Sequence, residues 1–271
     1  MRKFILFLFL LLPIFTNFIK AQTNKICVNV DHSCSTNSLK KNSTKKIKLI
    51  IHLKFNEAIR SNNDFAINSV DGKSFKIYHG SKIKRREGSF VFFTGHPEQG
   101  ISLGRLDFHQ PVTVAFWIKR DISSKMDSSH KKQPEYAQEY NQRKGRLLSA
   151  HGIESNKHIG SLRLGPEELE VWQASNQWGT LIPGPFPIEE WLHIAITFDE
   201  KCNATGYLNG IPQNMIQAGF DFGQNTVVFG SVSQNRYGFP FAGAIGDLRI
   251  YRGVLNEKKI ATLAKTSPYQ I

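Results

Sequence analysis

Two runs of strictly alternating side chains, "VTVAFWI" at 112–118 and "WLHIAITF" at 191–198, constrain this chain most. Successive side chains of a β-strand point to opposite faces, so a period of two directs one set toward a core. β-Branched and aromatic residues dominate both runs, which favours strands over helices. The side chains expected in the core are Val112, Val114, Phe116, Ile118, Leu192, Ile194, Ile196 and Phe198.

Further short apolar runs, separated by Gly, Pro, Asn and Asp, follow the same pattern. They are "KLIIHLKF", "SFVFF", "RLLSAHG", "GSLRLG", "ATGYLNG", "TVVFG" and "AIGDLRIY". Many short strands without long helical periodicity predict an all-β fold, a two-sheet antiparallel jelly-roll sandwich. One helix is expected at 256–265, with Asn256 as N-cap and Ile260, Leu263 and Ala264 on its apolar face, closing one end of the sandwich.

The N-terminus has the pattern of a secretory signal peptide. "MRK" precedes the apolar run "FILFLFLLLPIFTNFI", and Ala21 offers a cleavage point. We therefore expect a signal peptide at 1–21 and a secreted mature chain with no membrane span, an uncleaved anchor being the alternative. A flexible basic leader at 22–48, one domain at 49–265 and a tail at 266–271 complete the expected organisation.

The formal net charge is +13, and removal of the signal leaves 32 basic against 22 acidic residues, about +10. This balance favours a polyanionic partner, and export argues against nucleic acid. The basic candidates lie in "KIKRRE" and in a long basic insertion expected at 121–145; solvated surface charge is the alternative interpretation. They are Lys84, Arg85, Arg86, Lys131 and Lys132.

Three cysteines predict at most one internal disulfide in an oxidising compartment. Cys27 with Cys34 is the simplest pairing and leaves Cys202 free, whereas Cys34 with Cys202 is the rival. No Cys/His spacing suits zinc. "NST" at Asn42 and "NAT" at Asn203 are N-glycosylation acceptors if the host has that machinery.

Four segments in order resemble the laminin G-like jelly-roll domain of the concanavalin A-like lectin/glucanase superfamily. They are "HLKFNEA", "VTVAFWIKRD", "EEWLHIAITFDEKCNATGYLNG" and "FAGAIGDLRIYRGVLNEKKIATL", spread over 49–265. The last part of the chain also resembles the C-terminal segment of pentraxins. This resemblance implies the sandwich fold, and it leaves lectins, adhesion modules and hydrolases as functional classes.

The hydrolase alternative rests on "PEELEVWQ" at 166–173, where Glu168, Glu170 and Trp172 share one face of a strand. Glycosidases of this superfamily carry a further acid where Trp172 or Gln173 stands. Neither residue titrates in a range useful for proton donation, so catalytic residues are not expected.

A calcium ion is the cofactor that the resemblance raises. Pentraxins place an acidic cluster where this chain has Val232, Ser233 and Gln234, so that double site is not expected. Asp247 stands at the closing-strand aspartate and has two interpretations: a single structural calcium ion, or a structural pair with Arg249.

Aromatic residues in turns are the remaining binding candidates, because a lectin stacks sugar rings on such side chains. Trp178, Tyr237 and Phe239 form this set, with packing under their loops as the alternative, and Trp172 on the strand at 166–173 joins them as a candidate. The sequence favours a secreted, non-catalytic module that binds a glycan or an extracellular protein. A glycan-active hydrolase and a purely structural protein-interaction module are the alternatives.

Overall fold

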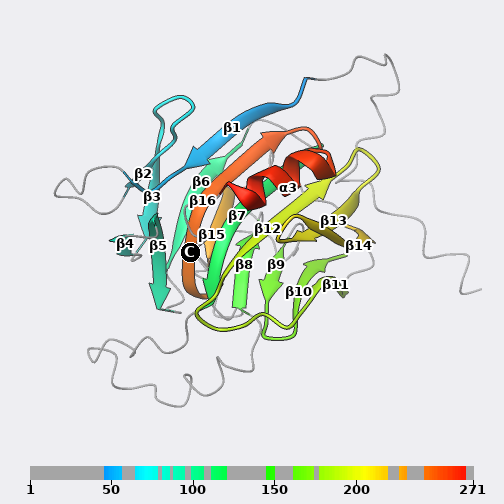
Figure 1. The fold of residues 1–271 in the computed structure, drawn as a ribbon. Helices are drawn as coiled ribbons and strands as arrows, with labels where there is room; N and C mark the ends of the chain where they lie inside the picture. The colour runs from blue at the N-terminus through cyan, green and yellow to red at the C-terminus, as the bar shows by residue number, and fades with distance from the viewer. Residues whose placement is uncertain are drawn as a thin grey trace, which may run out of the picture.

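The computed structural model describes residues 46–56, 65–78, 81–85, 88–94, 99–106, 111–120, 145–149, 161–173, 177–218, 226–230 and 241–266, without the side chains of 81–85, Thr94 and Arg146. They form two packed sheets of eight strands, with one helix in the described region (Figure 1). The named strand pairs are antiparallel. The predicted all-β sandwich is therefore confirmed.

Each sheet is built from strands that are distant in sequence. Sheet A has the order β14 (Ile211–Gln217), β13 (Asn203–Leu208), β12 (Trp191–Phe198), β7 (Val112–Arg120), β16 (Ala242–Arg252), β5 (Gly88–Thr94) and β4 (Ser81–Arg85), and β1 (Lys48–Leu53) pairs with β16. Sheet B has the order β11 (Trp178–Pro183), β10 (Glu168–Trp172), β9 (Leu162–Leu164), β8 (Gly145–Ser149), β15 (Thr226–Gly230), β6 (Gly100–Arg105), β3 (Ser74–Tyr78) and β2 (Phe65–Ile67).

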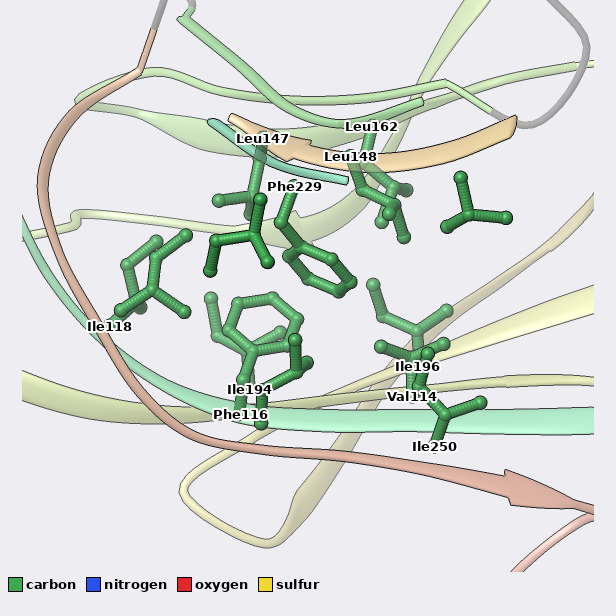
Figure 2. Close-up of a cluster of buried hydrophobic side chains, with 14 of the residues drawn as sticks. Val114, Phe116, Ile118, Leu147, Leu148, Leu162, Ile194, Ile196, Phe229 and Ile250 are labelled. Atoms are coloured by element: carbon green, nitrogen blue, oxygen red, sulfur yellow. The ribbon is translucent and has the colours of Figure 1, made fainter. Parts of the chain in front are cut away.

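The main core fills the space between the two sheets, and Figure 2 shows its centre. All eight side chains expected from the alternating runs of β7 and β12 belong to this cluster, so that prediction is confirmed. Phe116 of sheet A meets Phe229 of sheet B edge to face, with ring centroids 5.5 Å apart. Burial of such rings on both sheets supplies the hydrophobic free energy that holds the layers together.

The helix α3 (Glu257–Lys265) begins as predicted, because the side chain of Asn256 accepts a hydrogen bond from the backbone N–H of Lys259 at 2.9 Å. Its position differs from our expectation. Ile260 packs with Ala115 and Ala195, so the helix lies on the outer face of sheet A and does not close an end of the sandwich (Figure 1). Small residues at 115 and 195 leave room for a helix there.

The hairpin between β13 and β14 turns at Asn209 and Gly210, both with positive φ, as a two-residue turn requires. The Asn209 side chain accepts a hydrogen bond from the backbone N–H of His193 at 2.9 Å. At the same edge, Asn214 donates to the backbone carbonyl of Thr180 at 2.9 Å and links the two sheets.

Cys202 is buried in the turn before β13 and is disulfide-bonded. The expectation that it stays free, with Cys27 paired to Cys34, is therefore wrong. Those two cysteines lie outside the described residues, and the choice between them as partner stays open.

The described residues contain no helix long and apolar enough to cross a membrane. The predicted signal peptide, most of the leader, nearly all of the insertion and most of the tail lie outside them.

Candidate functional site

Trp172 and Trp178 face each other across the hairpin of β10 and β11, where they form a register pair. Their ring centroids lie 5.1 Å apart at an interplanar angle of 77°. Both residues are half-buried. Leu169 and Val171, which alternate with the strand's polar residues, lie in the core, so the two indoles lie on the outer side of sheet B.

Arg163 of β9 completes this arrangement beside Glu170, its register partner on β10. Its Nε donates a hydrogen bond to the Glu170 carboxylate, which is only 5% exposed. The guanidinium carbon lies 4.1 Å from the centroid of the Trp178 ring, within the range of a cation–π contact. One arginine therefore joins the acid of β10 to the indole of β11.

Glu168 lies on the same side of β10 and accepts a hydrogen bond from the hydroxyl of Thr180. We call the outer surface formed by Arg163, Glu168, Glu170, Trp172, Trp178 and Thr180 the tryptophan face. It has one cation and two carboxylates, each of which accepts a hydrogen bond from a side chain of a neighbouring strand. The shared direction predicted for Glu168, Glu170 and Trp172 agrees with these contacts.

The predicted basic candidates do not join the tryptophan face. Lys84 and Arg85 belong to β4, the edge strand of sheet A, whereas β11 is the edge strand of sheet B beside β14. β4 and β11 thus lie at opposite ends of the sandwich (Figure 1). The other candidates, Arg86, Lys131, Lys132, Tyr237 and Phe239, lie outside the described residues, as do Cys27, Cys34 and Asn42.

Asp247 lies on the outer side of sheet A, in a bulge of β16 with φ 46°. Its carboxylate accepts hydrogen bonds from His52 Nε2 at 2.7 Å and from Arg249 at 2.9 and 3.1 Å. Burial raises the pKa of Asp247, but the His52 hydrogen bond and the Arg249 charge outweigh it, so the pKa is below its ordinary value. Burial lowers the Arg249 pKa, but Asp247 outweighs it and the net shift is upward.

This arrangement matches the structural interpretation of Asp247, with His52 as an additional partner. Both carboxylate oxygens already accept bonds from partners that can carry positive charge, so the donor set does not fit a calcium ion. Among the residues that the structure describes, no group of three or more His, Cys, Asp or Glu side chains could hold a metal. Val232, Ser233 and Gln234 lie outside them.

His193 is a buried titratable side chain on the same sheet. It is 2% exposed, and its ring lies 5.4 Å from that of Trp117. Burial, partly offset by the charge of Asp247, lowers the pKa of His193 to about 4. Its Nδ1 has no hydrogen-bond partner in the described part of the chain. His193 is therefore neutral at pH 7.

Asn203, the described glycosylation acceptor, stands at the first position of β13 and is half-buried. Its side-chain amide donates to Asp199 Oδ2 at 2.9 Å, and its backbone N–H donates to Oδ1 at 2.8 Å. Modification of this asparagine stays a prediction.

The described residues form a two-sheet antiparallel sandwich with a helix on the outer face of sheet A. Residues 94–261 match a laminin G family model described as the Concanavalin A-like lectin/glucanases superfamily. The match covers more than half of the 271 residues, so the chain belongs to this superfamily. No curated protein sequence matches the chain.

Solved structures share the fold at low sequence identity. Domain 4 of AbnA, an extracellular GH43 arabinanase from Geobacillus stearothermophilus in complex with arabinotriose, has a TM-score of 0.56 and 18% identity, over 80% of this chain and 98% of that one. The binding domain of Paraclostridial Mosquitocidal Protein 1 has a TM-score of 0.55 and 15% identity, over 80% and 51%. Trypanosoma rangeli sialidase in complex with sialic acid has a TM-score of 0.56 and 12% identity, over 80% and 32%.

Proposed function

We propose that this chain is a secreted, non-catalytic recognition module that binds a glycan through the tryptophan face. The observation that carries the proposal is the edge-to-face pair of Trp172 and Trp178, half-buried on the outer side of sheet B beside Arg163 and Glu170. Glycan-complexed relatives in the fold comparison support the ligand class, since domain 4 of AbnA was solved with arabinotriose.

The chemistry of the face suits a sugar. One side of a pyranose or furanose ring presents C–H groups, which pack on an indole, and its rim presents hydroxyls. Arg163 stands beside the Trp178 indole, and Glu168 lies further along the same face of β10; both can make charge-assisted hydrogen bonds to such hydroxyls. Their partners Thr180 and Glu170 hold both side chains in place before a ligand arrives, which lowers the entropy lost on binding.

Binding is favoured over hydrolysis by the same contacts. Retaining glycosidases need two carboxyl groups in separate roles, a nucleophile and an acid that donates a proton. Here Glu170 is held by Arg163 and is nearly fully buried, and the next outward position on β10 is Trp172. The face thus offers aromatic surface where the catalytic pattern needs its second acid.

A glycan array on the mature protein tests the proposal. The array includes neutral oligosaccharides, with arabino-oligosaccharides among them, and is run with and without a chelator. We expect binding that the chelator does not change and that Trp172→Ala weakens by about tenfold or more. Met215→Ala on β14, at a side chain 67% exposed, is the matched surface control.

Three outcomes would contradict the proposal. They are the absence of glycan binding by the wild type, unchanged binding by a folded Trp172→Ala variant, and release of reducing sugar that Glu168→Gln abolishes. Thermal unfolding of each variant establishes that it is folded. Export is tested separately by mass spectrometry of the secreted protein, which we expect to begin near Gln22.

A further inference from the structure

Two rows of side chains cross the outer face of sheet A on four adjacent strands. In the first, Trp191 of β12 stands opposite Lys119 of β7, then Ala244 of β16 and Phe92 of β5. Residues opposite each other on antiparallel strands point to the same face. The second row runs in the same strand order and contains His193, Trp117, Gly246 and Phe90.

Small residues on β16 let the flanking rings meet above it. Phe90 comes from β5 and Trp191 from β12, yet their ring centroids are 5.2 Å apart at an angle of 66°. Phe90 and Trp117 are 1% and 2% exposed, whereas Trp191 is half-buried. The rows thus form an aromatic floor of which Trp191 and Phe92 are the more accessible parts. We call Phe90, Phe92, Trp117, Lys119 and Trp191 the lysine–aromatic face.

Lys119 lies in the centre of this floor, on a central strand of the sheet. Its ammonium is 5.3 Å from the Trp191 ring centroid and 5.8 Å from that of Phe90. No carboxylate among the described residues pairs with it, in contrast to Arg163 with Glu170 and Arg249 with Asp247. A half-buried cation has lost part of its hydration, and an anion from a ligand can compensate that loss.

The described charged groups on the neighbouring strand β16 do not offset the charge of the ammonium. Asp247, Arg249 and His52 form one hydrogen-bonded group in which the carboxylate and the guanidinium neutralise each other. The neighbouring His193 is neutral, because burial keeps its pKa at about 4.

We propose that the lysine–aromatic face is a second ligand site, for a carboxylated sugar residue whose carboxylate meets Lys119 and whose ring packs beside Trp191. A single ammonium suits one carboxylate per sugar, whereas a heavily sulfated chain needs several cations together. The tryptophan face carries two carboxylates against one cation and disfavours acidic glycans. The two outer faces of the sandwich therefore select ligands of different charge.

Calorimetric titration with oligogalacturonate and with its fully methyl-esterified form tests this site, because the pair shares one skeleton and differs in charge. We expect the wild type to bind the acid form more tightly than the ester, and increasing salt to weaken the binding. Lys119→Met should remove about tenfold or more of the affinity for the acid form. Trp191→Ala should weaken binding of the acid form as well.

Lys201→Met, at an exposed lysine of the turn before β13 and outside both faces, is the matched control and should leave oligogalacturonate binding unchanged. Equal affinity of Lys119→Met and the wild type for the acid form would overturn the proposal, as would equal affinity of the wild type for both forms or no binding at millimolar concentration. The site is independent of the tryptophan face. Loss of neutral-glycan binding in Trp172→Ala and loss of acidic-glycan binding in Lys119→Met are separate results.

Discussion

Burial of His193 makes the stability of the protein depend on pH in a defined window. The unfolded chain binds a proton at this imidazole below its ordinary pKa of 6.5, whereas the folded chain does so only below about 4. The contribution of neutral His193 to the free energy of unfolding is therefore lost progressively as the pH falls from 6.5 to about 4. The difference of roughly 2.5 pKa units corresponds to about 3 kcal/mol of unfolding free energy.

His193→Phe isolates this contribution, because it removes the titrating group and keeps an aromatic ring beside Trp117. The assay is urea unfolding at pH 7, 5.5 and 4. The wild type should lose about 3 kcal/mol more than the variant between pH 7 and 4. Asp247 does not confound the comparison, because both proteins contain it and its pKa is lowered, so its contribution is present above its ordinary pKa and is lost at lower pH. Parallel pH profiles for the two proteins would refute the reasoning.

Three further predictions concern stability and are measured by urea unfolding at pH 7. Asn256→Ala removes the N-cap hydrogen bond to Lys259 and should cost about 1 kcal/mol; no change would mean that the cap is dispensable. Gly210→Ala places a Cβ 2.8 Å from the Ala261 Cα at a φ of 84°, so it should cost at least about 1 kcal/mol, and a stabilised variant would contradict this. Phe116→Ala should cost roughly 3–5 kcal/mol, because the ring is fully buried against Phe229; a loss below 1 kcal/mol would contradict the packing.

Local periodicity predicted which side chains of β7 and β12 enter the core. It did not predict that the opposite faces of these strands are covered as well. Trp117 and His193 are 2% exposed because residues from other strands pack around them, and Ala115 and Ala195 are buried under α3. A period of two identifies the two faces of a strand, whereas the partners that cover each face depend on strand order.

The pairing of Trp172 with Trp178 could be predicted from the sequence, whereas the contact of Arg163 with Trp178 could not. Trp172 and Trp178 end and begin consecutive strands, so a hairpin between them already brings them opposite each other. Arg163 belongs to the preceding strand and carries no motif that singles it out. His52 and Asp247 are 195 positions apart, and only the pairing of β1 with β16 brings them together.

The placement of the basic candidates relative to the tryptophans also depended on strand order. Lys84 belongs to β4, the edge strand of sheet A, whereas Trp178 belongs to β11, the edge strand of sheet B, and Trp172 to its neighbour β10, at the opposite end of the sandwich. The positions of these residues along the sequence do not indicate how far apart β4 and β11 lie in the fold. Lys119, a cation that stands between two aromatic rings, was part of the "VTVAFWIKRD" motif and received no functional role from the sequence.

The central claim is that the outer faces of this sandwich bind glycans through named tryptophans, and the indole N–H signals of a ¹⁵N-labelled protein test it most directly. The chain has four tryptophans, so four signals are assigned by single Trp→Phe variants. A neutral oligosaccharide identified on the array should shift the signals of Trp172 and Trp178, and oligogalacturonate should shift that of Trp191. Glycan binding that leaves all three signals unmoved would contradict the account.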